Sequence, residues 1–328
     1  MQTRPFNLPI IMKSGYINPV YKLSLNDVSK VPAKISYSQW SMFSKCPKQW
    51  KLSYIDKLAP FTYSIATCFG TAFHETLQEY LTVLYTDSVK AANEINLHDL
   101  LLTHLKLEYS KGVEANNGEH FSTPSELAEH LDDGVQILDW FKKRRSQYFS
   151  TKNMELVGIE VELGVPASSV NKNVYWYGFI DIVVRDTVLN TIKIIDIKTS
   201  RMGWNKWQKA DKLKAAQLVA YKKYFSDQFG TPIDNVDIEF FIVKRKLLEE
   251  SMFPQKRIQI LNPASGSITR KKIQRDIDSF IEFCFDETGK KRVEQNYLSI
   301  AGKGSKHCKW CPFKMDYDNC PKEDRIRQ

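Results

Sequence analysis

Two short hydrophobic segments, each carrying an acidic residue, constrain the fold of this chain most strongly. Residues 175–184 and 191–200 are rich in β-branched and aromatic residues and are flanked by turn formers, a pattern typical of strands. Asp181 lies in the first segment, and Asp196 lies in the second, two residues before Lys198. Because alternate side chains of a strand share a face, Asp196 and Lys198 should point the same way, about 7 Å apart. Two carboxylates and an ammonium on paired strands predict a site for metal-assisted hydrolysis.

The length and composition of the chain indicate a globular protein. With 328 residues, 42% of them hydrophobic, the chain can bury a core without disulfides. No segment approaches the roughly 20 consecutive apolar residues that a membrane helix needs. The first 25 residues lack the apolar region and cleavage site of a secretory signal. We therefore expect a cytoplasmic protein with no membrane partner.

The charge of the chain favours a polyanionic partner. The formal net charge is +9 and the pI is about 9.0, which fits nucleic acid most simply. Each basic cluster taken alone can equally be a solvated helix end or loop, so the overall excess is the better evidence. The clusters are residues 142–145, 244–246, 270–272 and 290–292.

Hydrophobic periodicity predicts an alternation of helices and strands. The first helices are expected from Ser38 to Tyr54 and after Gly70. The region 88–150 should be largely helical, with a polar break at 116–124 and its clearest helix at 133–149. Strands are expected at 155–165, 175–184, 191–200 and 238–244, and further helices at 209–229 and 268–295. Strands followed by a long helix and another strand predict an α/β core. The chain contains no Gly-x-x-x-x-Gly-Lys-[Ser/Thr] loop, so no nucleotide-driven motor is recognisable.

The strand predicted at 155–165 has a regular alternation. Ile159, Val161 and Leu163 should share one face, and Glu160 and Glu162 should share the other. Alternation alone would expose both glutamates.

The six cysteines favour a metal over disulfides in a cytosolic chain. Cys308 and Cys311 have metal-like spacing, whereas Cys68 and Cys284 lack partners at such spacing and should be buried thiols. Four thiolates can hold either zinc or a [4Fe–4S] cluster, and the spacing alone does not separate these two possibilities.

Several short motifs follow one another along the chain. The central ones are Gly178-x-x-Asp181, then Asp196-x-Lys198, then Gln217-x-x-x-Tyr221. The flanking motifs are Gly70-Thr-Ala-Phe-His74-Glu75, Ser36-Tyr-Ser38, Cys46-Pro-Lys-Gln-Trp50-x-x-x-Tyr54, and Cys308-Lys-Trp-Cys311-Pro with Cys320-Pro321. Each motif is weak alone, but together they span nearly the whole chain, and their order resembles the PD-(D/E)XK nuclease superfamily, and more narrowly its RecB-like branch. The architecture is similar to the AddB nuclease domain, CRISPR-associated nucleases and stand-alone phage exonucleases.

The resemblance implies a restriction-endonuclease-like core, with a mixed central sheet flanked by helices, and a metal-dependent DNA exonuclease. His74, Asp181 and Asp196, with the backbone carbonyl of Ile197, would hold Mg²⁺ or Mn²⁺. Glu160 is a further candidate ligand. Lys198 would orient the attacking water and stabilise charge on the phosphate.

The DNA-binding candidates have two origins. The resemblance places Gln217 and Tyr221, four residues apart on one helix face, against DNA. Independently of the family, Trp204 and Trp207 are interleaved with cations such as Arg201, a pattern that suits single-stranded DNA. The two tryptophans can equally be core residues that anchor a loop.

The resemblance also favours a [4Fe–4S] cluster over zinc. Its ligands would be Cys46, Cys308, Cys311 and Cys320, although the interval before Cys320 is longer than the family pattern. Such a cluster would join the N-terminal helix to the C-terminal tail.

The expected domain organisation is an N-terminal extension, 1–35, followed by one nuclease domain, 36–328. This domain would include the helical region 88–150 and the cluster-binding tail 300–328.

DNA is the expected partner, together with a helicase, an integrase or another recombination protein. Two alternatives stay open. A non-catalytic DNA-binding subunit is disfavoured by the intact Asp and Lys residues. A zinc-binding interaction protein would explain the cysteines but not the acids.

Overall fold

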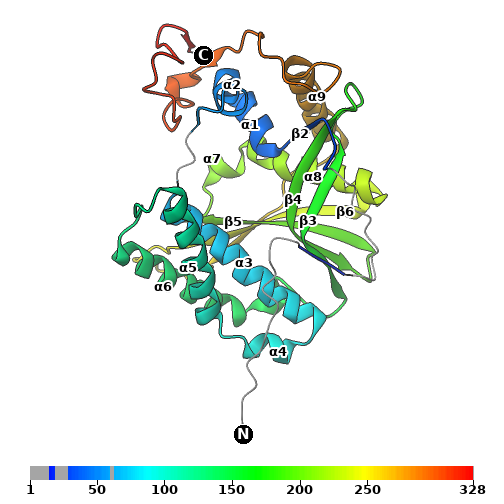
Figure 1. The fold of residues 1–328 in the computed structure, drawn as a ribbon. Coiled ribbons are helices and arrows are strands. Elements are labelled where there is room, and N and C mark those ends of the chain that lie inside the picture. The colour runs from blue at the N-terminus through cyan, green and yellow to red at the C-terminus, as the bar shows by residue number, and fades with distance from the viewer. Residues whose placement is uncertain (1–14, 19–28, 60–62, 328) are drawn as a thin grey trace.

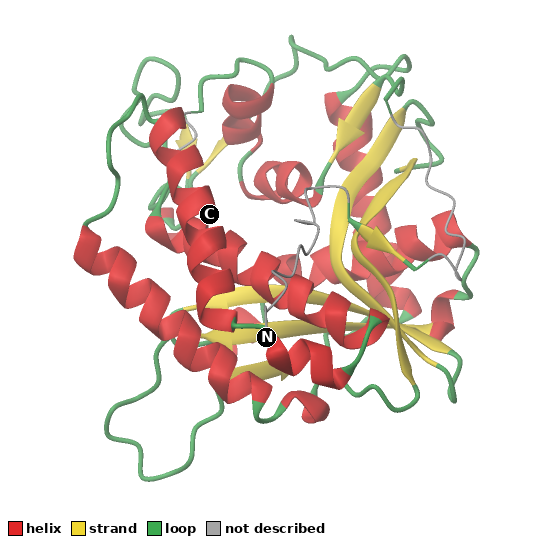
Figure 2. Cartoon of the chain, turned by 60° about the horizontal axis from the view of Figure 1, so that its bottom comes forward, coloured by secondary structure: helices red, strands yellow, loops and turns green. Residues whose placement is uncertain are grey.

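The computed structural model describes residues 15–18, 29–59 and 63–327, which build a central sheet between two layers of helices (Figures 1 and 2). The strands of this sheet are β1 (Tyr16–Ile17), β2 (Ala33–Ile35), β3 (Met154–Pro166), β4 (Val174–Asp186), β5 (Thr191–Ser200), β6 (Val236–Lys244) and β7 (Ile258–Leu261). Their order is β1-β3-β4-β5-β6-β7, and β2 pairs with the start of β4.

The sheet is mixed. β3, β4 and β5 form an antiparallel meander, β5 and β6 are parallel, and β7 pairs antiparallel with β6. This confirms the predicted α/β class with a mixed central sheet. The expected N-terminal extension contributes β1 and β2 to this sheet; the remainder of that prediction lies outside the described residues.

Helices cover both faces of the sheet. One layer packs its hydrophobic core against residues such as Ile182 and Ile195 and comprises α3 (Ile65–Thr86), α4 (Val89–Glu94), α5 (Leu97–Ala115) and α6 (Pro124–Lys142). The opposite layer comprises α1 (Tyr37–Lys45), α2 (Pro47–Tyr54), α8 (Lys212–Phe229) and α9 (Ser267–Cys284). The short α7 (Lys206–Lys209) precedes α8, and the tail forms a small parallel sheet of β8 (Ser299–Ile300) and β9 (Arg325–Ile326).

The prediction of a single helix from Ser38 to Tyr54 is wrong. Two helices, α1 and α2, meet at Cys46, whose backbone is extended, with φ −155°. Pro47 explains the break, because proline disfavours helical geometry in the residue before it and suits the first turn of a new helix. The N-cap is Ser36, whose side chain accepts a hydrogen bond from the Gln39 N–H.

Other helix boundaries also differ from expectation. α3 begins at Ile65, before Gly70 rather than after it, because Ser64 caps it. α6 occupies 124–142 rather than 133–149, since Thr123 and Glu126 form a capping box at its start. α9 ends at Cys284, well short of residue 295.

The expected alternation of β3 is wrong at Glu160. Ile159 packs in the core beneath α3, whereas Val161 and Leu163 pack in the opposite core. Glu160 has φ +49°, in the left-handed region that non-glycine residues rarely adopt. This backbone geometry inverts the alternation, so the side chains before and after Glu160 point to opposite faces.

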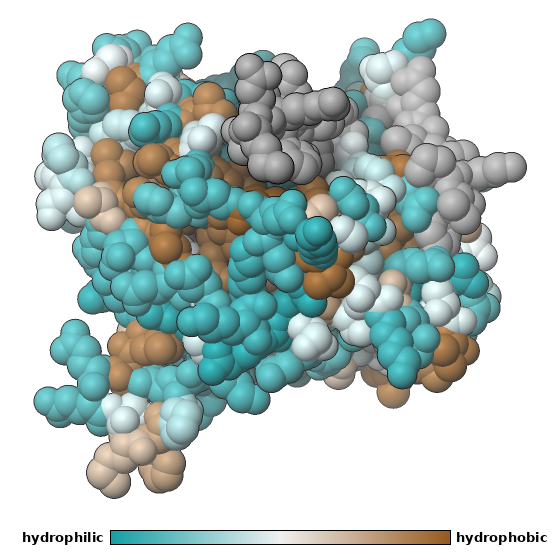
Figure 3. All heavy atoms as spheres, turned by 90° about the horizontal axis from the view of Figure 1, so that it is seen from below, coloured by the Kyte–Doolittle hydropathy of each residue, from teal (hydrophilic) through white to brown (hydrophobic). Residues whose placement is uncertain are grey.

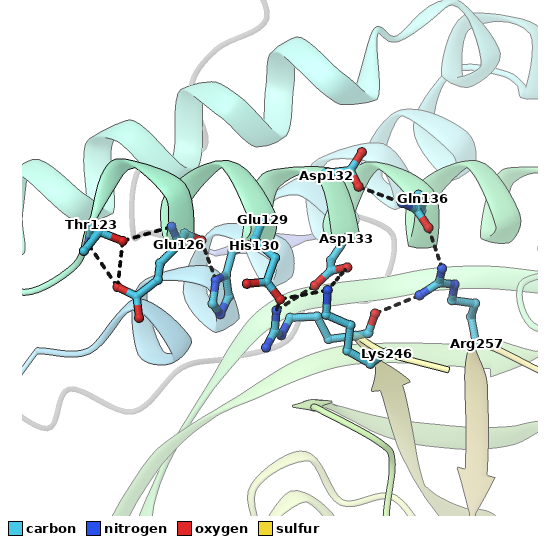
Figure 4. A network of polar contacts seen from close by, with 10 residues as sticks. Thr123, Glu126, Glu129, His130, Asp132, Asp133, Gln136, Lys246 and Arg257 are labelled. Carbon is cyan, nitrogen blue, oxygen red and sulfur yellow. Dashed lines mark hydrogen bonds and ion pairs between the residues drawn. The ribbon is translucent and has the colours of Figure 1, made fainter. Parts of the chain in front are cut away.

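An ion-pair network fastens the helical layer to the end of β6 (Figure 4). The carboxylate of the buried Asp133 on α6 lies 2.6 Å from Arg245 Nη1 and 2.9 Å from Lys246 Nζ. Both cations also contact Glu129. Two of the three cations in the 244–246 cluster are therefore engaged in intramolecular ion pairs.

The side of the molecule around α4, seen from below in Figure 3, carries mostly hydrophilic side chains with hydrophobic ones between them. Among the described residues, no helix combines the length and the apolar character that crossing a bilayer requires.

Candidate active site

The two acidic residues come together where β4 and β5 separate. Antiparallel pairing between these strands runs from Asp186–Thr191 to Ile182–Ile195 and stops there. Just beyond this point, Asp181 Oδ2 accepts a hydrogen bond of 2.7 Å from the Ile197 N–H. The Ile197 N–H lies beyond the last β4–β5 pair, so the Asp181 carboxylate accepts its hydrogen bond in place of a β4 carbonyl. This bond fixes the carboxylate beside β5.

Asp196 and Lys198 share a strand face, as their spacing predicts. Lys198 Nζ lies 2.7 Å from Asp196 Oδ2, and Asp196 is 1% exposed. Burial would lower the pKa of Lys198, but the carboxylates of Asp196 and Asp181 outweigh it and raise that pKa. The ammonium is therefore held in its charged form at the site.

Helix α3 brings His74 to the Asp181 carboxylate. His74 Nδ1 lies 3.5 Å from Asp181 Oδ2. Gly70 permits this approach, because a Cβ atom there would lie 3.1 Å from Thr199 Oγ1 on β5. Burial, assisted by the charge of Lys198, lowers the pKa of His74 to about 3. The imidazole is then neutral near pH 7, the form that can donate a lone pair to a cation.

Gln78 is a site residue that the sequence reasoning missed. Its Nε2 donates to Glu160 Oε1 at 2.5 Å and to the Asp181 carbonyl at 3.2 Å. The available signal was its position four residues after His74, on the same helix face. Burial raises the pKa of Glu160, and Asp196 contributes in the same direction.

Among the described side chains of the site, three carboxyl groups, those of Asp181, Asp196 and Glu160, accompany the ammonium of Lys198. Burial raises the pKa of Asp181 well above its usual value, and Asp196 and Glu160 raise it further against the opposing effect of Lys198. Burial likewise raises the pKa of Asp196. Oxygen donors that are destabilised by mutual repulsion suit a divalent cation. Within residues 15–18, 29–59 and 63–327, however, no three His, Cys, Asp or Glu side chains are already arranged as a metal-binding group.

A cleft of about 640 Å³ extends along α3 beside these carboxylates. Its walls include His74, Gln78, Glu160 and Lys198.

At the edge of this cleft, His104 of α5 bridges two carboxylates of α3, with Nδ1 3.0 Å from Glu75 Oε2 and Nε2 3.1 Å from Glu79 Oε2. Burial would lower the pKa of His104, but the two glutamates raise it to about 9. The bridge ties α5 to the helix that carries His74.

Gln217 and Tyr221 on α8 face the site from the other side of β4. Gln217 Nε2 lies 3.4 Å from the Tyr221 hydroxyl, and that hydroxyl lies 3.4 Å from where a Cβ atom of Gly178 would stand. Burial raises the pKa of Tyr221, and the nearby Asp196 carboxylate adds to the effect. The Tyr221 hydroxyl therefore lies directly against Gly178 of β4, near the carboxylates.

The predicted aromatic pair has two different environments. Trp204 is 9% exposed and packs on Phe240, with ring centroids 5.0 Å apart. Trp207 is 74% exposed on α7, beside the ammonium of Lys206. Arg201 lies exposed in the turn after β5. Trp204 is thus a core residue, whereas Trp207 is available to a ligand.

Four cysteines from both ends of the described chain meet around one small cavity. Cys46, Cys308, Cys311 and Cys320 all line this cavity, whose volume is about 20 Å³, roughly the space of one water molecule. Cys46 Sγ also accepts a hydrogen bond of 3.3 Å from the Ile300 N–H. Cys68 and Cys284 are buried elsewhere, as predicted.

Comparison with known proteins identifies the family. The model of the PD-(D/E)XK nuclease superfamily matches residues 34–315. A search of curated proteins gives no match. Among solved structures, a candidate exonuclease from Eubacterium rectale is similar, with 12% sequence identity and a TM-score of 0.46 over 78% of this chain and 83% of that one. On the match to the family model, this chain belongs to the PD-(D/E)XK nuclease superfamily.

Proposed function

We propose that this chain is a Mg²⁺- or Mn²⁺-dependent DNA exonuclease of the RecB-like branch, acting on single-stranded DNA or DNA ends. The observation that carries the proposal is the contact of Asp181 with His74 and of Asp196 with Lys198 beside one cleft, which His74 and Lys198 line. The basic net charge of the chain supports a DNA substrate. Recombination, repair and the processing of DNA for CRISPR adaptation are processes that need such an activity.

The donor set fits a divalent cation. Asp181, Asp196 and the neutral imidazole of His74 would hold it, with the Ile197 carbonyl and Glu160 as further candidate donors. When bound, the cation supplies a Lewis acid that activates water and neutralises charge on the phosphate. The raised pKa values of both aspartates support this assignment, because a bound cation would offset the burial that raises both pKa values and the repulsion that adds to it at Asp181.

The remaining residues position the substrate and stabilise charge. Lys198, which forms an ion pair with Asp196, would donate to the phosphate as negative charge develops. Gln78 holds Glu160 and the backbone of Asp181 in place. Gln217 and Tyr221 would contact DNA, and Trp207 with Arg201 would extend the contact along α7.

We further propose that Cys46, Cys308, Cys311 and Cys320 bind a [4Fe–4S] cluster. Their shared cavity supports this, because Cys46 lies more than 250 residues before the other three in sequence and the fold brings all four thiols to one place. The cluster would join α2 to the tail 300–328 within a single nuclease domain, 36–328. Because its ligands come from both ends of the domain, its binding should be coupled to folding.

The test is a cleavage assay on protein purified without oxygen. Wild-type protein and Lys198→Ala are incubated with end-labelled single-stranded and duplex DNA, with Mn²⁺ or with EDTA. We expect the wild type to release short products only with Mn²⁺. Lys198→Ala should lose cleavage but keep most DNA binding, since phosphate contacts are spread over many cations. DNA binding without cleavage by the wild type would favour the non-catalytic alternative instead.

A further inference from the structure

A row of aromatic side chains leads along β4 to the candidate active site. Tyr175, Tyr177 and Phe179 alternate along the strand and end two residues before Asp181. Because alternate residues share a face, the three aromatic side chains lie on the same side of the sheet. At the end of the row, Phe179 lines the cleft together with His74, whose imidazole contacts Asp181. We propose that this aromatic row is a track on which a single-stranded DNA end stacks its bases as it enters the site. The inference rests on the proposed nuclease function and specifies how its substrate is held.

The row is not part of the hydrophobic core. On the opposite face of the same strand, Trp176 and Ile180 are fully buried, and Trp176 stacks on Tyr224 with ring centroids 4.8 Å apart. Tyr175 and Tyr177 are only partly buried, and Phe179 is 38% exposed. The start of β4 extends beyond the helices α3–α6 that cover the rest of the sheet (Figure 1). Aromatic side chains on this open face are therefore available to a ligand.

Charge near the row favours a nucleic acid. The ammonium of Lys34, on β2, lies 4.6 Å from the centre of the Tyr177 ring. Parallel pairing places Lys34 beside Tyr175, and Lys34 is exposed. Aromatic rings with an adjoining cation are the combination by which proteins hold single strands, since bases stack while phosphates meet the charge. Duplex DNA keeps its bases inside and cannot use such rings.

The spacing of the row suits a stacked strand. Residues two apart on a β-strand are separated by about 7 Å, twice the 3.4 Å rise per nucleotide of a stacked strand. Successive rings of the row can therefore stack on every second base of the strand. Glu162 pairs with Phe179 across β3 and β4. Its carboxylate would repel phosphates, so the backbone of the strand should lie on the Lys34 side.

The row also opens directly onto the reacting groups. Phe179 lines the same cleft as His74 and Lys198. A strand that follows the row would therefore bring successive phosphates to the carboxylates of Asp181 and Asp196. The Tyr177 and Phe179 rings are already in contact, with centroids 5.5 Å apart, which limits the side-chain ordering needed on binding.

The test measures binding of fluorescein-labelled oligothymidylate in EDTA, where metal-dependent cleavage does not interfere. Phe179→Ala should weaken binding by about 5- to 150-fold, the effect of losing one base–aromatic stack. Phe179→Trp should restore most of it, because the larger ring also stacks. Phe253→Ala is the matched control: Phe253 is 77% exposed in the loop between β6 and β7, and its removal should leave binding unchanged. Duplex binding should be the same in all four proteins.

The outcomes separate this inference from the proposed function. If the wild type binds and cleaves single strands while Phe179→Ala binds as tightly as the wild type, the track is refuted and the nuclease stands. If Phe179→Ala and Phe253→Ala weaken binding equally, the effect is not specific to the row and the track is likewise refuted. If the wild type neither binds nor cleaves single-stranded DNA, the proposed function itself fails. Equal thermal midpoints would show that each variant is folded.

Discussion

The bridge that His104 makes between Glu75 and Glu79 should make folding stability depend on pH. The histidine is buried, and the two carboxylates raise its pKa from 6.5 to about 9. A group whose pKa is higher in the folded than in the unfolded state stabilises the folded state. The full contribution is present when the pH is below the unfolded-state pKa, and it is lost as the pH rises through the folded-state pKa. The relevant window is therefore between pH 6.5 and about 9.

The magnitude follows from the pKa difference. At 1.36 kcal/mol for each tenfold change in proton affinity, the bridge contributes about 3 kcal/mol at low pH. About 2 to 3 kcal/mol should remain at pH 7, and almost none at pH 10, where the imidazole is neutral in both states. His104→Gln should therefore be less stable than the wild type by about 2 to 3 kcal/mol at pH 7 and by less than about 1 kcal/mol at pH 10.

The assay is urea unfolding at pH values from 6 to 10, comparing the wild type with His104→Gln and with His98→Gln. His98 lies on the same helix, and its side chain is 52% exposed, so its replacement controls for other groups that titrate in this range. The decisive quantity is the gap in unfolding free energy between the wild type and His104→Gln. A gap that stays constant from pH 7 to pH 10 would refute the reasoning.

Three further predictions concern other parts of the molecule. Asp133→Asn should lower the free energy of unfolding by about 2 to 3 kcal/mol, because it leaves two cations of the α6 network without their buried partner; equal urea midpoints would contradict this. Trp204→Ala should cost about 3 to 5 kcal/mol of stability as a core truncation, whereas Trp207→Ala should leave stability within about 0.5 kcal/mol and weaken single-strand binding; the reverse pattern would overturn these assignments. Cys46→Ser should lose iron and visible absorption near 400 nm while Cys284→Ser keeps both, and one zinc with no iron in the wild type would refute the cluster.

The strands were predictable because their signals are local. The β-branched runs define β4 and β5, and the period of two places Asp196 and Lys198 on one face without any tertiary information. The meeting of Asp181 with Ile197, by contrast, depends on where the pairing of two strands ends. The family motif could anticipate that meeting, but the periodicity could not.

The errors have particular causes. Pro47 marks the break between α1 and α2 and is a local signal for it. The prediction of one helix instead followed the helical spacing of Trp40 and Trp50 on either side of this proline. The inverted alternation at Glu160 has no local signal, since a positive φ in a glutamate reflects its surroundings and not its own preference. Gln78 was missed for a related reason: its partners lie on β3 and β4, and only the packing of α3 over the sheet brings them together.

The central claim is that Asp181 and Asp196 hold the divalent cation needed for DNA cleavage. Anomalous diffraction from crystals soaked in Mn²⁺ tests this most directly, with Asp196→Asn crystals as the control. We predict one strong manganese peak between the two carboxylates, beside His74, which is lost or much weakened in the variant. A wild-type protein that cleaves DNA with Mn²⁺ but shows its manganese elsewhere, or an equal peak in Asp196→Asn, would contradict the account.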